Sequence, residues 1–430
     1  MKTINKLFGI VLLLIIVSCN KSPKKITNVD DYNSYLKDNG DEMLQLATEG
    51  LIFWEKKLEK EPNQFPYLAK VAASQSLIFT KTGNIKALIE AEENLIEVNK
   101  RTGFNKPSYL RSLARNYISQ HKFKEALELL KKAEANGENL KGTEKMLFDV
   151  HLELGNFDLA KSYLEKIRKE NDFDYLIRLS KWSDHRGNLD AAIKYMEQAK
   201  GIAEASNVPS TKQWVYTNLA DYYGHAGNIK ASYNHYLKAL KLDPNDAYAK
   251  KGIAWIVYSH EKNADEALRI LDSVTQTYNA PHYHLLKAEI TEFKGDKILQ
   301  EEQLKLYSRA VNNPLYGNMY NKYNALLYAE NPLETTKALV IANMEIKYRP
   351  TPQSYDLLAW TYYNHGDTEE ALKIMEKHVV GKTFEPEAML HLAQIYTANG
   401  KEDEAKKLKK ELLESTFELG PIKAQKVKKL

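Results

Sequence analysis

A small side chain recurs along most of this chain at a spacing close to 34 residues. The steps between successive occurrences are 38, 34, 32, 40, 34, 34, 37, 34 and 34 residues. The positions are Ser76, Ala114, Phe148, Ser180, Ala220, Ala254, Ala288, Ala325, Ala359 and Ala393, among which only Phe148 is large. Such a period indicates one supersecondary unit used many times, because a unit that cannot bury its apolar face alone must stack on neighbours. It replaces the two or three globular domains that 430 residues would otherwise suggest.

The residues around these positions repeat as well. A leucine precedes the small residue, a tyrosine follows three positions later and a glycine ends the helix, as in Leu358, Tyr362 and Gly366, then Leu392, Tyr396 and Gly400. This pattern resembles the tetratricopeptide repeat, a helix-turn-helix unit of 34 residues. The resemblance implies an all-α fold, a right-handed α-solenoid of about ten helix-turn-helix repeats.

The amino-terminal residues predict export from the cytoplasm. Lys2 and Lys6 precede an eleven-residue apolar run, Leu7 to Val17. As a helix this run would rise about 16 Å, too short for a membrane span but typical of a secretory signal peptide. The run ends in Ile16-Val17-Ser18-Cys19, which resembles the lipobox of bacterial lipoproteins. That resemblance implies lipidation of Cys19 and cleavage before it. The alternative is a buried structural cysteine after an uncleaved apolar helix.

These two features divide the chain. We expect a lipoprotein signal peptide at 1–18, a lipidated tether at 19–30 and an irregular helical cap at 31–64. The repeat solenoid then covers 65–414, and a capping segment covers 415–430. The lipidated protein would be held in the bacterial cell envelope. Asn20 follows the lipobox in place of the aspartate that typically retains lipoproteins in the inner membrane, so an outer-membrane anchor facing the periplasm is favoured.

Composition and motifs argue against several functions. The 61 basic and 57 acidic residues leave a net charge of +4, which lacks the clustered basic footprint of a nucleic-acid-binding protein. His282 and His284 are the closest pair of potential metal ligands, but on a helix their side chains point about 200° apart. Gly381-Lys382-Thr383 resembles the end of a phosphate-binding loop without its upstream glycine. We therefore predict no enzymatic activity, no metal and no cofactor.

The candidate binding residues come from the resemblance. In tetratricopeptide repeats the second, fifth, ninth and twelfth residues of each first helix line a concave groove where peptides bind. Transferred to four of the repeats here, these positions include aromatic and basic side chains, namely Trp214, Tyr248, Lys251, Trp255, Tyr258, Trp360, Tyr363, Arg111 and Arg115. Large aromatics can anchor a bound peptide, but they can equally pack between neighbouring repeats.

The leading hypothesis is a non-enzymatic, lipid-anchored scaffold that binds proteins or peptides in the bacterial envelope, through a partner that the sequence does not identify. One alternative is a glycan-binding outer-membrane lipoprotein of a nutrient-uptake system. Another is a non-catalytic subunit that fixes an enzyme complex to the membrane.

Overall fold

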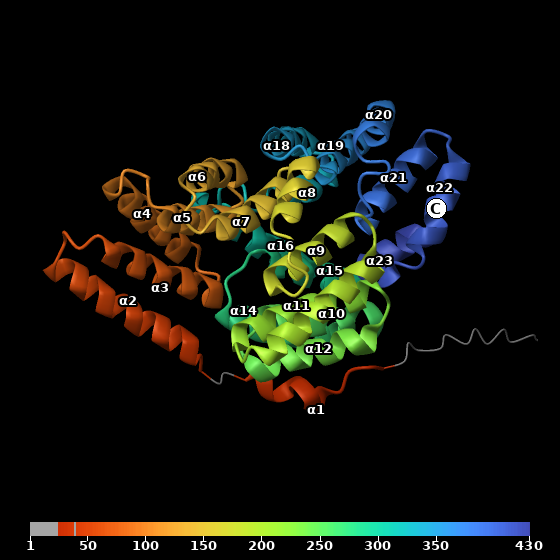
Figure 1. Ribbon diagram of the computed structural model, residues 1–430. Coiled ribbons are helices and arrows are strands. Elements are labelled where there is room, and N and C mark those ends of the chain that lie inside the picture. Colours follow the sequence, from red (N-terminus) through yellow and green to blue (C-terminus); the bar gives the residue numbers. More distant parts are fainter. Residues whose placement is uncertain (1–24, 38–39) are drawn as a thin grey trace, which may run out of the picture.

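The computed structural model describes residues 25–37 and 40–430, and every regular element in this part of the chain is helical (Figure 1). Cys19 and the predicted signal peptide lie outside the described residues. The longer helices before the chain midpoint are α2 (Glu42–Lys60), α3 (Pro66–Thr82), α4 (Ile85–Arg101), α5 (Pro107–Ser119), α6 (Phe123–Asn136), α7 (Leu140–Glu153), α8 (Phe157–Lys166), α9 (Phe173–His185), α10 (Leu189–Ala205) and α11 (Pro209–His225).

The later helices are α12 (Ile229–Leu242), α13 (Ala247–Trp255), α14 (Ala264–Thr277), α15 (His282–Lys294), α16 (Lys297–Val311), α17 (Asn321–Ala329), α18 (Thr335–Tyr348), α19 (Pro352–His365), α20 (Thr368–His378), α21 (Pro386–Ala398), α22 (Glu402–Leu412) and α23 (Thr416–Lys429). Short elements are α1 (Val29–Tyr32), the 3₁₀ turns η1 (Asn33–Leu36) and η3 (Pro314–Tyr316), and the π-helical turn η2 (Ile256–His260) that continues α13.

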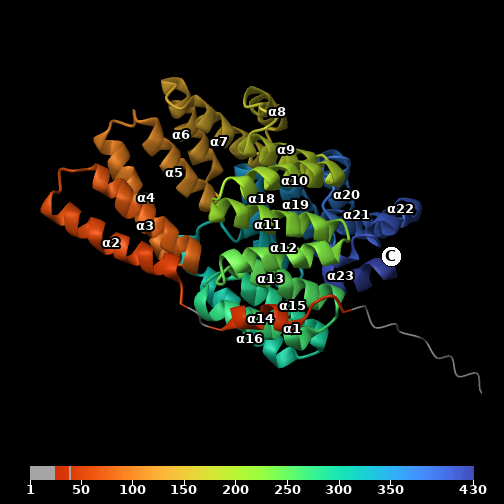
Figure 2. The ribbon, with the colours of Figure 1, turned by 60° about the horizontal axis from the view of Figure 1, so that its bottom comes forward.

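Consecutive helices pack as ten pairs, α3 with α4 through to α21 with α22. Each recurrent small residue lies in the first helix of its pair, and Ala114, Ala220 and Ala359 are fully buried there. A residue without bulk lets the two helices approach closely. The pairs stack on their neighbours into one winding array (Figure 2). The predicted all-α solenoid is confirmed.

The turns show why the repeats end where they do. In the Ala220 repeat, Gly227 adopts a φ of +73°, and the Asn228 amide then donates to the carbonyl of Tyr223 at 2.8 Å. This closes α11 with a left-handed residue that costs glycine little. The side-chain oxygen of Asn228 next accepts the Ala231 amide at 3.2 Å and caps α12. Two adjacent residues thus stop one helix and start the next.

The amino-terminal residues do not form a single helix pair. Helix α2 packs along α3, whereas residues 25–36 lie against α12 and α14, far along the chain (Figure 2). The Glu261 carboxylate accepts the backbone amides of Ile26 and Thr27 at 2.7 and 2.6 Å, and the hydroxyl of Tyr32 donates to Glu266 at 2.7 Å. Residues 25–30, expected to be tether, are therefore held on the solenoid.

The solenoid also turns back on itself. The Asn279 amide between α14 and α15 donates to the carbonyl of Thr82 at the end of α3, at 2.7 Å. Farther along, Arg349 pairs with Glu153 at 3.5 Å, and its guanidinium lies over the ring of Phe123. Early repeats therefore contact late ones.

Candidate functional site

The first helices of four successive repeats, α11, α13, α15 and α17, line a common cavity of about 480 Å³ on the concave side. Helices α21 and α23 complete its wall. We call this cavity the central pocket. Its walls include Asp221 and Gly224 of α11, Lys251 and Trp255 of α13, His282 of α15 and Tyr323 of α17.

Helical periodicity positions these side chains. The second, fifth, ninth and twelfth residues of a first helix follow each other at steps of three, four and three, so they share one face. In α13 and its continuation these are Tyr248, Lys251, Trp255 and Tyr258. The first three line the central pocket. Tyr258 is fully buried beneath it, where its hydroxyl donates to Glu289 at 3.1 Å.

One end of the pocket combines a charged amine with aromatic rings. The Lys251 amine lies 4.3 Å from the centre of the Tyr248 ring and, among the described residues, has no hydrogen-bond or ion-pair partner. The carboxylate of Asp221, on the pocket wall, already accepts the hydroxyls of Tyr236 and Tyr248, at 2.5 and 2.6 Å. Burial lowers the pKa of Lys251, and the negative charge of Asp221 offsets this only in part.

His282 is a second pocket residue whose charged form no neighbouring negative charge stabilises within the described ranges. Its ring stacks on Tyr283 at 4.6 Å and lies parallel to Tyr323 at 6.2 Å. Burial, and secondarily the positive charge of Lys251, lower its pKa to about 4, so the imidazole is neutral at pH 7. This end of the pocket can therefore donate hydrogen bonds from Lys251 to an oxygen acceptor while aromatic rings cover the apolar part of a ligand.

The other end of the pocket is acidic. Glu387 forms an ion pair with Lys423 of α23 and lies 3.8 Å from Lys322. Burial would raise the pKa of Glu387, but the amines, led by Lys423, hold it at about 2. Burial raises the pKa of Glu289 and of Glu418. His225 is 4.0 Å from Glu418.

The remaining sequence-predicted residues lie elsewhere. Trp360 is 3% exposed and stacks on His391 at 4.0 Å and on Tyr363 at 5.0 Å, so these aromatics pack between repeats. Trp214 is 42% exposed and meets Phe173 edge-on at 6.3 Å, outside the pocket. The structure thus unites Tyr248, Lys251 and Trp255 but separates them from the other tryptophans.

The two arginines of the Ala114 repeat are also remote from the pocket. Arg111 donates to the carbonyl of Glu138 at 3.0 Å and to the hydroxyl of Thr143 at 3.1 Å. These bonds tie α5 to the next repeat. Arg115 is exposed.

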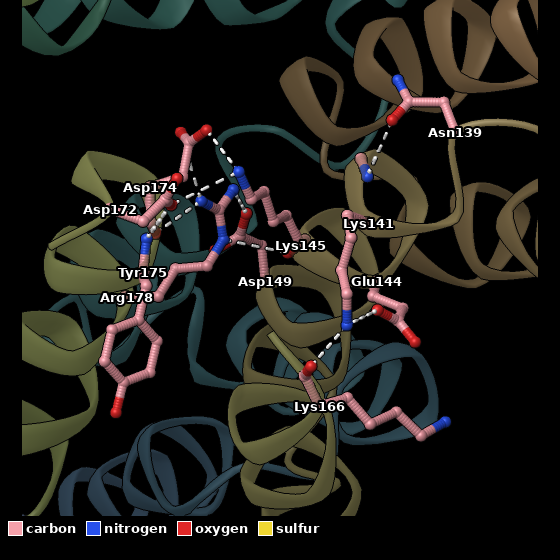
Figure 3. Close-up of polar contacts among 11 residues, drawn as sticks. Asn139, Lys141, Glu144, Lys145, Asp149, Lys166, Asp172, Asp174, Tyr175 and Arg178 are labelled. Atoms are coloured by element: carbon pink, nitrogen blue, oxygen red, sulfur yellow. Dashed lines mark hydrogen bonds and ion pairs between the residues drawn. The ribbon is translucent and has the colours of Figure 1, made fainter. Parts of the chain in front are cut away.

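Sequence reasoning missed a second set of concave residues, on α7 and α9. Here Lys145 pairs with Asp174 at 2.7 Å, and Arg178 pairs with Asp149 at 2.7 Å (Figure 3). Lys145, Asp149 and Asp174 occupy groove positions of the Phe148 and Ser180 repeats. The same spacing rule, applied to those repeats, would have found them. We call these residues, with Asp172 and Arg178, the α7–α9 network.

Sequence reasoning also placed nothing from the carboxyl-terminal segment in the groove. Phe417, Glu418 and Lys423 of α23 line the central pocket. No repeat pattern reaches these residues, because they follow the last repeat. In the described ranges, no three His, Cys, Asp or Glu side chains are grouped to hold a metal ion. Within the same ranges, every helix is too short or too polar to cross a bilayer.

Comparisons with known proteins agree with the repeat architecture. Models of the tetratricopeptide repeat match residues 145–207, 215–246 and 352–378. No curated protein matches the sequence. The matched segments include α7 to α12 and the α19–α20 pair, which supply one wall of the central pocket and the α7–α9 network.

Three solved structures are also similar to this chain. A tetratricopeptide repeat protein from Parabacteroides merdae has 16% identity and a TM-score of 0.39, covering 57% of this chain and 93% of its own. PilF of Pseudomonas aeruginosa has 16% identity and a TM-score of 0.37, with 50% and 96% covered. Yeast Tom70 has 17% identity and a TM-score of 0.33, with 93% and 95% covered. The chain contains tetratricopeptide repeats, stacked into an all-α solenoid.

Proposed function

We propose that this protein is a non-enzymatic scaffold that binds a protein segment in the central pocket and along the adjoining concave face. One observation carries the proposal. Four successive repeats converge on a cavity where the Lys251 amine has no hydrogen-bond or ion-pair partner among the described residues and aromatic rings surround it. No hydrogen bond within the described residues has to be broken for this amine to donate to a ligand oxygen.

The geometry suits an extended peptide. Lys251 can donate to a backbone carbonyl or a carboxylate, while Tyr248, Trp255 and Tyr323 offer aromatic surface. Because the repeats hold these groups in place before binding, the receptor loses little conformational entropy. Stacked repeats with a preformed concave surface commonly serve protein interaction.

We further propose that a lipid on Cys19 holds the scaffold at a bacterial membrane, with the periplasmic side of the outer membrane favoured. The support is the lipobox-like Ile16-Val17-Ser18-Cys19 and the docked segment that follows. Ile26, which is bonded to Glu261, lies seven positions after Cys19. Seven residues reach at most about 24 Å, so a lipid on Cys19 would keep the α12–α14 side of the solenoid close to the bilayer.

Site-specific cross-linking in cells tests the binding proposal. A photoreactive phenylalanine replaces Tyr248 in the pocket or, as control, the exposed Ile298 on α16. We expect a reproducible protein adduct at position 248 that Lys251→Glu abolishes, and none at 298. Adducts that persist in Lys251→Glu, or that occur equally at 298, would contradict a peptide site here. Binding of the purified protein to a glycan array, without adducts, would favour the glycan alternative.

Metabolic labelling tests the anchor separately. Growth with an alkyne fatty acid should label the wild-type protein and leave Cys19→Ser unlabelled and released from membranes. Label in Cys19→Ser would overturn the assignment. The pocket adducts report on binding and the label on anchoring, so either proposal can fail alone.

A further inference from the structure

The carboxyl-terminal segment carries a backbone carbonyl that its own helix leaves without a donor. In an α-helix the carbonyl of Phe417 would accept the amide of residue 421, but that residue is Pro421 and has no N–H. Gly420 adopts φ +76° and ψ 168°, which breaks the helical path at the same place. The sequence therefore leaves the Phe417 carbonyl without its α-helical donor.

The groove supplies two donors to this carbonyl. The indole Nε1 of Trp255 donates to it at 3.1 Å, and the hydroxyl of Ser259 donates at 2.6 Å. Ser259 lies in η2, the π-helical turn that continues α13. Such turns displace side chains from the regular helical positions and are frequent at functional sites. Trp255, a predicted groove residue, is thus engaged by the chain's own terminus.

Two glycines make the contact possible. A Cβ on Gly224 of α11 would lie 2.8 Å from the Phe417 ring, and none of the other neighbours of that position comes closer than 3.5 Å. On the segment, a Cβ on Gly420 would lie 2.9 Å from the Trp255 ring and 3.0 Å from a Glu289 oxygen. Glycine on both partners lets the segment and the groove approach closely.

Charge completes the contact. Lys423, two residues after the proline, pairs with Glu387 on α21. Beyond these contacts the segment has a separate, apolar role: Leu419 and Val427 are buried with Leu390 and Ala393 of α21, as a cap on the last repeat. The aromatic, the free carbonyl and the lysine face the groove, and the aliphatic residues face the cap.

We propose that the central pocket recognises a segment of the form Phe-x-x-Gly-Pro-x-Lys, and that residues 417–423 are an intramolecular copy which a partner segment must displace. The proposal rests on the function proposed above and names its ligand. The recognition elements are Gly224 for the ring, Trp255 and Ser259 for the carbonyl, and Glu387 for the lysine.

A peptide of residues 413–430, labelled with fluorescein, tests this with the full-length protein and fluorescence anisotropy. In the wild-type chain the site is filled, so we expect weak binding. The variant Phe417→Ala/Lys423→Ala, called the vacated variant below, removes the ring and the amine of the chain's own segment while keeping its backbone carbonyl, Leu419 and Val427. Because the peptide then competes with a weakened intramolecular copy, it should bind this variant about tenfold more tightly. Adding Gly224→Ala to that variant should remove the gain, because the new methyl meets only the ring of the incoming phenylalanine.

Control peptides carry Phe417→Ala or Pro421→Ala, and each should bind the vacated variant about tenfold more weakly. Thermal unfolding followed by circular dichroism verifies that the variants are folded. If a variant is unfolded, hydrogen exchange on the wild-type chain decides: added peptide should speed the exchange of α23, which it displaces, if the proposal holds, and should leave the exchange of α23 unchanged if it does not. The proposal is overturned if the peptide binds the wild-type chain and the vacated variant with equal affinity. It is also overturned if both control peptides bind the vacated variant as tightly as the unaltered peptide does.

The two proposals can fail independently. Cellular adducts at position 248 with no binding of the 413–430 peptide to any variant would overturn the recognition sequence and leave the scaffold function standing. Peptide binding without cellular adducts would leave the intramolecular contact and overturn the scaffold function. Concentration-dependent dimers of the vacated chain would support recognition of the segment in a second copy.

Discussion

Two regions of the concave surface treat their charges in opposite ways. In the α7–α9 network, Lys145 and Arg178 are each bonded to carboxylates of the neighbouring helix (Figure 3). In the central pocket the Lys251 amine has no such bond among the described residues. Lysines at the same groove position are therefore paired with carboxylates in the α7–α9 network and left unpaired, within the described chain, in the central pocket. The first holds repeats together, and the second leaves the Lys251 amine able to donate to a ligand.

Among the charged residues, the largest expected effect comes from breaking the α7–α9 network. Arg178 donates to Asp149 and to the backbone carbonyls of Lys145 and Asp174, and its side chain is 12% exposed. Arg178→Ala removes these three bonds and leaves the Asp149 carboxylate without its ion-pair partner, which should lower the free energy of unfolding by about 3 kcal/mol. Urea denaturation measures it, with Arg168→Ala on the exposed loop as control. A loss no greater than that of the control would mean that the network does not stabilise the repeats.

The next effect is a pH dependence of the free energy of unfolding that arises from His282 in the central pocket. The pKa of His282 is about 4, because burial and then Lys251 disfavour the charged ring, whereas the ordinary value is 6.5. The unfolded chain therefore binds a proton that the folded chain does not, so stability is lost as pH falls from 6.5 toward 4. Between pH 7 and 5 this histidine should account for about 2 kcal/mol.

The variant His282→Phe should show a correspondingly smaller loss of unfolding free energy between those pH values. His365→Gln, at an exposed position on α19, is the matched control and should follow the wild type. A His282→Phe chain with the wild-type pH profile would show that the ring is not held neutral by the pocket.

A smaller effect has the opposite sign. Lys251→Met keeps an unbranched side chain, one atom shorter, and removes a half-buried charge that has no hydrogen-bond partner among the described residues. We expect an increase in unfolding free energy of about 1 kcal/mol at pH 7, against the loss from Arg178→Ala. Since burial lowers the pKa of Lys251 in the folded chain, the gain should shrink as the pH rises toward 10.5, the ordinary lysine value. Destabilisation by Lys251→Met at neutral pH would show that the amine is already satisfied.

The smallest effect lies between the two regions. Trp214 of α11 meets Phe173 of α9 and is 42% exposed. Trp214→Ala should change the free energy of unfolding by no more than about 1 kcal/mol. Trp360→Ala, at another groove position but 3% exposed, serves as the buried reference and should cost about 4 kcal/mol. Similar costs for the two variants would remove the distinction between a surface and a packing tryptophan.

The sequence predicted the repeat unit well, because its signals are local. Small residues such as Ala220 mark helix contacts, and Gly227-Asn228 marks a turn, within a few residues of where they act. The groove positions followed from helical periodicity, and Tyr248, Lys251 and Trp255 do line one cavity. Trp360 shares that periodicity but is buried, because the local pattern does not contain the neighbouring ring of His391.

The rest depended on contacts between distant residues. Nothing near residue 26 indicates that Glu261 will bind its amide, and nothing near Phe417 indicates Trp255 and Ser259. The amino-acid sequence by itself determined the helices, their turns and the stacking of ten helix pairs, since each depends on residues a few positions apart. Only the tertiary structure decided which groove charges are neutralised and which pocket stays open. The winding of the solenoid sets the distances between charged side chains of different repeats, and burial determines the free-energy cost of each charge that has no partner.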